Sequence, residues 1–368
     1  MSALQSATVT SPVKKTGGTK TRIEWIDVAK GIGIVLVSFG HLRNGDGQSV
    51  WLPALDTLIS AIYLFHMPLF YFLGGLTFGM RGGFKAFLIR KVKTLLVPYY
   101  VFSLYFLAKP IAVLVIPSMR SAFQTSHNYG LAHQFVDVLV MGGGLWFLMA
   151  FFVAEFMMYG LVSITKNNHV MLTITGVALI LISYAANGFI GKLPIPFQLW
   201  KGIEITGFMA LGYVLREWLK VLNQRKAIAY SAVGLVVLCV LTWVALSDQV
   251  PLSVKWIVLL LAAITGAFAF TVLCIAIERC GWLAYIGRAS LVFYALNALT
   301  LNISKFVIFR LLHLSVTNSN FAIQFCMGLV TTVLALVILY FENLFVQKYM
   351  PWSIGKKHVF PRKETGIS

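Results

Sequence analysis

The sequence predicts an all-α polytopic membrane protein, a bundle of about ten transmembrane helices. Of its 368 residues, 59% are apolar and 11% charged, and the mean hydropathy is +0.83. Soluble domains carry about 25% charged residues. The apolar residues also gather into stretches close to the ~20 residues that a membrane-crossing helix needs. These stretches cover about 23–42, 57–79, 95–116, 136–164, 169–187, 197–215, 228–247, 254–277, 286–309 and 320–346.

Three segments are expected along the chain. Residues 1–21 are rich in Ser, Thr and Lys and predict a disordered cytoplasmic segment. Residues 22–347 form the transmembrane domain, and residues 348–368 form a basic cytoplasmic tail. The first apolar stretch contains Asp27 and Lys30 and is followed by no small-residue cleavage site. It therefore predicts a retained span and not a cleaved signal peptide.

Basic residues gather in every second connection between the apolar stretches. Cytoplasmic loops of membrane proteins carry an excess of Lys and Arg. If the N-terminus is cytoplasmic, the connections on that side include Lys14, Lys15, Arg81, Lys85, Arg90, Lys91, Lys93, Arg216, Lys220, Arg225, Lys226, Lys356 and Lys357. The opposite loops hold few, among them Arg43, Arg120, Lys192 and Arg310. The pattern predicts a multi-pass protein of the cell membrane with both termini cytoplasmic.

The net charge of +18 therefore follows from membrane orientation, and we expect no nucleic-acid partner. The four cysteines show no spacing typical of a metal site. Three of them, Cys239, Cys274 and Cys326, fall in apolar stretches, and Cys280 lies in a short connection. We expect free thiols and no metal.

The first stretch places ionisable residues on one face of a helix. Lys30 and His41 are eleven positions apart, about three turns or roughly 16 Å along the axis. Asp27 and Ser38 fall on the same side. Such residues are costly inside a membrane and often mark a site. His41 suits general base work and Lys30 an anionic ligand, with Asp27 as its ion-pair partner. The structural alternatives are a helix-end histidine bound to water or headgroups, and a snorkelling lysine.

His66 lies in the second stretch beside Pro68, which removes a helical hydrogen bond and can kink the helix. It is a second candidate catalytic residue, and the alternative is a histidine packed against a neighbouring helix. The basic run that contains Arg90 and Lys93 either sets topology or binds phosphate.

Three further polar residues stand inside apolar stretches without an evident partner: Glu155, Glu204 and Asn297. We expect the two glutamates to face the bundle interior, and helix–helix hydrogen bonding is the default for Asn297. The sequence assigns none of the three a role.

Several segments together resemble one family. WIDVAKGIGIVLVSFGH is similar to the first span of the integral-membrane acyltransferase-3 family, whose signature is a basic residue, ten residues and a histidine, here Lys30 and His41. Landmarks follow in the family's order: FHMPLFYFLGGLTFG, IRKVKTLLVPYY, LWFLMAFF, LGYVLRE and YIGRASLVFYALN. The resemblance covers about 22–310 and is closest to the sugar O-acetylase branch, including fucose-type enzymes. The chain departs from it in having Lys30 where members often have arginine, and Asn297 where many have histidine.

The resemblance implies transfer of an acyl group, usually acetyl, from cytoplasmic acyl-CoA to a hydroxyl of a surface or lipid-linked glycan. Lys30, Arg90 and Lys93 would then bind CoA, with Asp27 holding Lys30. His41 would deprotonate the hydroxyl or accept the acyl group briefly, and His66 would orient it or the acceptor. The expected partners are acetyl-CoA, the glycan or lipid-linked sugar, and the bilayer.

Two other functions remain open from the sequence. Ten spans with a few intramembrane charges also fit a transporter or flippase for a glycan or lipid-linked precursor, although the paired broken helices of such carriers are not evident. The second alternative is an acyltransferase of the other membrane-bound O-acyl class, whose helices are arranged differently. Acyl-CoA hydrolysis or transfer by the purified protein separates an enzyme from a carrier.

Overall fold

The computed structural model describes residues 23–42, 52–115, 130–191, 193–247, 249–312 and 320–356. Within these ranges every regular element is a helix, which confirms the predicted fold class. The expected disordered segment 1–21 and most of the expected tail lie outside the described residues. The first residues after 347 complete the last long helix and form one more helical turn, Pro351–Ile354.

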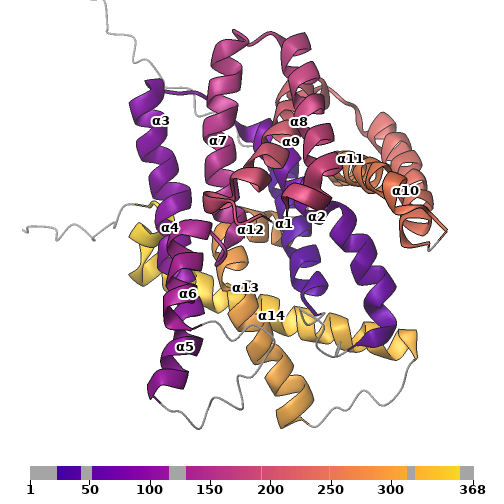
Figure 1. Ribbon diagram of the computed structural model, residues 1–368. Coiled ribbons are helices and arrows are strands. Elements are labelled where there is room, and N and C mark those ends of the chain that lie inside the picture. Colours follow the sequence, from indigo (N-terminus) through magenta and orange to yellow (C-terminus); the bar gives the residue numbers. More distant parts are fainter. Residues whose placement is uncertain are drawn as a thin grey trace, which may run out of the picture.

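Fourteen α-helices make up the described bundle (Figure 1). They are α1 (Glu24–Gly40), α2 (Asp56–Thr77), α3 (Gly83–Lys91), α4 (Val97–Ser103), α5 (Tyr105–Val115), α6 (Leu131–Val136), α7 (Trp146–Ile164), α8 (His169–Ile190), α9 (Leu199–Lys220), α10 (Gln224–Leu246), α11 (Leu252–Ile277), α12 (Gly281–Arg288), α13 (Ser290–Lys305) and α14 (Phe321–Tyr349). Short 3₁₀ or π segments join some of them: η1 (Pro53–Leu55), η2 (Val92–Leu96), η4 (Asp137–Met141), η5 (Pro196–Gln198), η6 (Phe306–Leu311) and η7 (Pro351–Ile354).

Each of the ten apolar stretches of the sequence contains helix in its described residues, but not all are simple spans. In the described residues, seven helices are long and apolar enough to cross a membrane. The helix α1 has 17 residues, fewer than the ~20 that hydrocarbon requires. The third stretch is broken between α4 and α5, and α9 carries several charged residues. The chain is therefore a multi-pass membrane protein, and the number ten stays a prediction.

The helices run between two ends of the bundle. We call one the Arg90 end: there α1 begins, α2 ends, and Arg90 bonds to the carbonyl of Gly79. We call the other the His41 end: there α1 ends at His41, and α13 ends at Lys305, which contacts the His41 carbonyl. The described chain starts and finishes at the Arg90 end, because η7 packs on η2. This arrangement is compatible with both termini lying on the same side of the membrane.

Small residues let the central helices approach closely. The helix α1 packs on α12, where a Cβ on Gly31 would overlap the Leu283 carbonyl and a Cβ on Gly287 the Asp27 carbonyl. The helices α2 and α9 meet in the same way at Gly75. Close backbone approach at small residues is the usual packing of membrane helices, because van der Waals contact must replace the hydrophobic drive. These contacts fix α1 and α2 at the centre, where they carry the candidate site.

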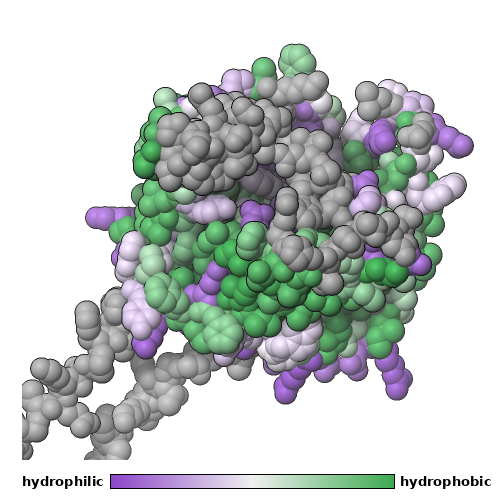
Figure 2. Space-filling model, turned by 90° about the horizontal axis from the view of Figure 1, so that it is seen from below, coloured by the Kyte–Doolittle hydropathy of each residue, from purple (hydrophilic) through white to green (hydrophobic). Residues whose placement is uncertain are grey.

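The outside of the bundle is apolar. Helices α8, α10 and α14 expose large side chains such as Ile174, Val236 and Phe341. Figure 2 shows hydrophobic residues over much of the visible face, with hydrophilic ones gathered mainly toward its edges. A soluble protein rarely exposes so much apolar surface, and a lipid environment explains it.

Candidate active site

A cavity of about 680 Å³ lies among α1, α2, α7, α8, α9, α11 and α13. This volume is within the ~300–1,000 Å³ typical of small-molecule sites. Both histidines expected to act in catalysis, His41 and His66, line it. The structure therefore brings together two residues that the sequence places on different helices.

His41 follows the last residue of α1, and its side chain is exposed where it lines the cavity. Its Nδ1 lies 3.4 Å from the hydroxyl of Tyr63 on α2. Its backbone carbonyl accepts a hydrogen bond of 2.9 Å from Nζ of Lys305 on α13. Two other helices thus hold the end of α1, one at the ring and one at the main chain.

His66 is buried on α2, one turn beyond Ile62. Its Nδ1 lies 2.9 Å from the Ile62 carbonyl, so Nδ1 carries the proton and Nε2 is left as an acceptor. The ring of Tyr63 lies between the two histidines, with centroids 5.0 Å from His66 and 6.3 Å from His41. Tyr63 is therefore the residue that connects the two imidazoles.

A second hydrogen bond joins α1 to α13. Ser38 Oγ donates to Asn297 Oδ1 at 2.7 Å, and both residues are buried. Asn297 thus makes the helix–helix contact that is the default for such a residue. Together with the Lys305 contact it fixes the second half of α1 against α13.

An ion pair stands in the wall of the cavity. Lys201 Nζ and Glu204 Oε2 on α9 are 3.0 Å apart, and Glu204 is buried as expected for an intramembrane carboxylate. Both residues line the cavity, together with Lys255 and the aromatic side chains of Trp146 and Trp256. Charged, aromatic and hydroxyl groups thus converge on one space.

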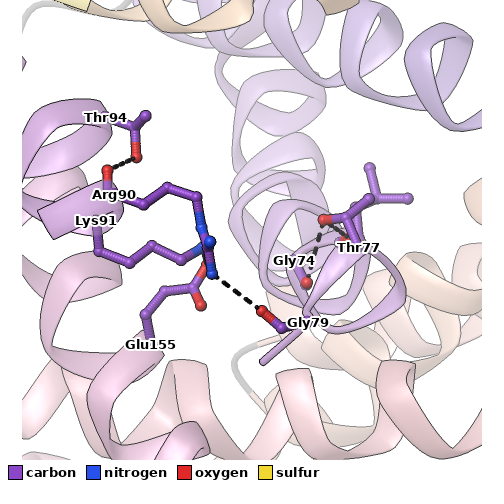
Figure 3. A network of polar contacts seen from close by, with 8 residues as sticks. Gly74, Thr77, Gly79, Arg90, Lys91, Thr94 and Glu155 are labelled. Atoms are coloured by element: carbon purple, nitrogen blue, oxygen red, sulfur yellow. Dashed lines mark hydrogen bonds and ion pairs between the residues drawn. The ribbon is translucent and has the colours of Figure 1, made fainter. Parts of the chain in front are cut away.

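The Arg90 end holds a cluster of charged side chains (Figure 3). Lys91 forms an ion pair with Glu155 of α7, and the charges of Arg90 and Lys30 act on the same carboxylate. The Arg90 guanidinium donates to the carbonyl oxygens of Gly79 at 3.5 Å and Arg81 at 3.3 Å. The chain thus gathers three cations around one glutamate.

The other expected site residues occupy simpler places. Lys93 lies in η2 with its side chain exposed. Asp27 is buried on α1, three residues before the partly exposed Lys30, and their ion pair stays a prediction. Within the described residues, no group of three or more His, Cys, Asp or Glu side chains suits a metal ion.

Sequence reasoning missed three contacts of the site. Tyr63 precedes His66 by three residues and so shares its helix face, a signal that was available. Lys305 is a cation inside an apolar stretch. Ionisable residues inside a membrane often mark a site, and this argument, used above for Lys30, applies to Lys305 as well. The pairing of Glu155 with Lys91 had no local signal, because 64 positions separate them.

The fold and the site together define a helical membrane protein with a histidine-lined cavity. The sequence model of a family described as an acyltransferase domain (Acyl_transf_3) matches residues 23–340. The chain therefore belongs to the acyltransferase-3 family and is a membrane acyltransferase. Comparison with curated proteins and with solved structures gave no match.

Proposed function

We propose that the protein transfers an acetyl group from cytoplasmic acetyl-CoA to a hydroxyl of a surface or lipid-linked glycan. The observation that carries this proposal is the course of α1. The helix α1 carries Lys30 in its first half, near the basic cluster, and is followed directly by His41 in the cavity. The rise between the two residues, about 16 Å, is comparable with the length of the pantetheine arm of CoA.

The Arg90 end would bind the donor. Coenzyme A carries several phosphate charges, and Arg90, Lys93 and Lys30 supply cations at this end. Arginine and lysine are the usual partners of phosphate, arginine with two parallel hydrogen bonds and lysine as a point charge. Asp27 and Glu155 would hold Lys30 and Lys91 in place. This end then faces the cytoplasm, as the distribution of basic residues predicts.

The chemistry would take place at His41. With Nδ1–H donating to the Tyr63 hydroxyl, Nε2 is free to act as the base. It takes the proton of the acceptor hydroxyl, whose oxygen attacks the thioester carbonyl carbon. The C–S bond breaks, and the CoA thiolate takes the proton back from the imidazolium. In the covalent variant Nε2 attacks the thioester carbon first, and the C–S bond breaks. The CoA thiolate takes the remaining N–H proton of the acylated imidazole and leaves as the thiol. The acceptor hydroxyl then attacks the acyl carbon, the N–acyl bond breaks, and the hydroxyl proton returns to the imidazole.

Purified protein in lipid nanodiscs tests the proposal. The donor is [¹⁴C]acetyl-CoA, and the acceptor is polysaccharide from cells that lack this protein. We expect label in the polysaccharide and release of an equal amount of CoA thiol. Label on the protein in the absence of acceptor would favour the covalent variant. Transport of a glycan without consumption of acetyl-CoA would instead favour a carrier.

The orientation is tested separately in intact cells. Tags at the N-terminus and the C-terminus should both be shielded from membrane-impermeant reagents. Labelling of either tag before lysis would contradict the proposed placement of the Arg90 end.

A further inference from the structure

We propose that the cavity of His41 and a second cavity beside it form one groove that binds two or more neighbouring units of an uncharged glycan. This inference rests on the proposed function and specifies its acceptor as a chain and not a single sugar. The second cavity has a volume of about 380 Å³ and is lined by α6, η4, the end of α8, the segment before α9 and the start of α9.

The two cavities are neighbours at the His41 end. Asn187 and Lys201 line both of them, so the wall of one continues into the wall of the other. Each volume lies within the ~300–1,000 Å³ of typical ligand sites. A ligand whose reacting hydroxyl reaches His41 can therefore extend past Lys201 into the second cavity.

The lining of the second cavity suits hydroxyl groups. Asp137 offers a hydrogen-bond acceptor, His133 a ring nitrogen, and the amides of Asn187 and Gln198 both kinds of group. Sugar hydroxyls both donate and accept, so they match such a mixed set. An apolar lipid chain would leave these groups without partners.

The charges of the groove balance. Its charged lining residues are two acidic ones, Glu204 and Asp137, and two basic ones, Lys201 and Lys255. Lys201 is moreover paired with Glu204. The Arg90 end differs, since Lys30, Arg90 and Lys91 surround one carboxylate there. The groove therefore favours an uncharged polyhydroxylated ligand over a phosphate-bearing one.

Backbone of an uncommon conformation lies at Gln198, which lines the second cavity, and at Phe197 directly before it. Phe197 and Gln198 have φ values of 55° and 54°, the left-handed region that residues other than glycine rarely adopt. The Gln198 side chain donates to the Met141 carbonyl at 3.2 Å and so ties η5 to η4, and both residues line the cavity. Strain of this kind persists where surrounding contacts enforce it and is concentrated at binding sites.

An indole N–H at this wall has no hydrogen-bond partner among the described residues. Trp200 lines the second cavity, and its Nε1 is buried without a hydrogen bond among the described residues. An indole nitrogen can only donate, and buried donors are nearly always satisfied. A sugar hydroxyl oxygen in the cavity is an acceptor of the required kind.

Fragment length is the variable that tests the groove. Polysaccharide from cells lacking the protein is cut by mild acid into a monosaccharide fraction and fractions of two or more units. Purified protein in nanodiscs then receives [¹⁴C]acetyl-CoA and each fraction. We expect kcat/KM for the longer fragments to exceed that for the monosaccharide at least ~10-fold, the effect of one or two added hydrogen bonds. Equal kcat/KM for all lengths would overturn the proposal.

Trp200→Phe removes the N–H and keeps a smaller aromatic ring, so the variant has no unsatisfied donor at this position. We expect KM for the longer fragments to rise about 3- to 10-fold, with unchanged KM for acetyl-CoA and for the monosaccharide. Trp243→Phe is the matched control, because Trp243 on α10 is 76% exposed and lines neither cavity. An equal loss with all fractions, or no loss, would contradict a role of Trp200 in the groove.

Binding without donor separates this inference from the proposed function. The dissociation constants of the same fractions are measured by microscale thermophoresis in the absence of acetyl-CoA. Length-dependent binding by a protein that transfers no acetyl group would support the groove and refute the transferase. Transfer with no dependence of binding on length would support the transferase and refute the groove.

Discussion

The two ends of α1 hold their ionisable residues in different ways. At the His41 end, His41, Lys201 and Glu204 line a cavity of about 680 Å³. At the Arg90 end, Lys91 and Glu155 contact each other directly, with Arg90 and Lys30 close by. The first arrangement leaves room for reacting atoms. The second concentrates positive charge, and under the proposed function it would bind the phosphates of the donor.

The two ends of α1 differ because they have different neighbours, and under the proposed function one helix would serve two tasks. The second half of α1 is fixed by α13, through Asn297 and Lys305. Its first half packs on α12, with Gly31 and Gly287 at the contact. If the ends act separately, variants at the His41 end should lower kcat, and variants at the Arg90 end should raise KM for the donor.

The largest effect is expected for His41→Ala. General base catalysis typically contributes about 10²- to 10⁴-fold, so acetyl transfer should fall at least ~100-fold. CoA binding and protein level should persist, because the donor end is intact. Acetyl content of the polysaccharide is measured in cells at matched expression. His169→Ala, at the start of α8, is the control. Near-normal acetylation by the His41 variant would refute the mechanism.

A smaller loss is expected for Lys305→Met. A hydrogen bond from a charged group is worth about 1.5–3 kcal/mol, which corresponds to roughly 10- to 100-fold in kcat if it all acts on the position of His41. KM for acetyl-CoA should stay unchanged, and Lys305→Arg, which keeps the charge and a donor, should recover part of kcat. Lys348→Met on α14 is the matched control. A rise in KM for the donor without a fall in kcat would contradict this role.

At the other end, Lys30→Ala should raise KM for acetyl-CoA about 10-fold, the effect of losing one charge-assisted contact. Its kcat should change little, and Lys30→Arg should behave almost as the natural protein does, because the charge is kept. Lys220→Ala removes a surface lysine paired with Glu217 and serves as the control. If Lys30→Ala and Arg90→Ala both leave the donor dependence unchanged, these residues serve topology alone.

The smallest effect is expected for Tyr63→Phe. The Tyr63 hydroxyl lies 3.4 Å from His41 Nδ1, which is long for a hydrogen bond, so its loss should lower kcat only about 3-fold. Tyr230→Phe on α10 is the control. Steady-state kinetics at saturating donor measures both variants. A loss as large as that of His41→Ala would show that Tyr63 itself transfers a proton.

Much of the fold was predictable because the signals are local. Every apolar stretch in the sequence contains helix in its described residues, and the first one, expected at 23–42, is α1. The count of spans was not predictable in the same way. Breaks such as the one between α4 and α5 depend on packing, and they divide a stretch that hydropathy treats as continuous.

The candidate site was predictable only in part. The sequence indicated His41 and Lys30, since a helical period places both on one face of one helix. It also indicated His66, which lines the same cavity. It did not indicate that Tyr63 lies between the two histidines, or that Lys201 and Glu204 share their cavity.

The sequence by itself determined the membrane character, the helices and the ionisable residues of α1, because hydropathy and helical periodicity act over a few turns of chain. Only the tertiary structure decided the partners. Lys305 reaches His41 across 264 positions and Lys91 reaches Glu155 across 64. Such pairs follow from which helix faces meet, and small residues such as Gly31 and Gly75 set how closely they meet. The cavity exists for the same reason, as the space that seven packed helices leave between them.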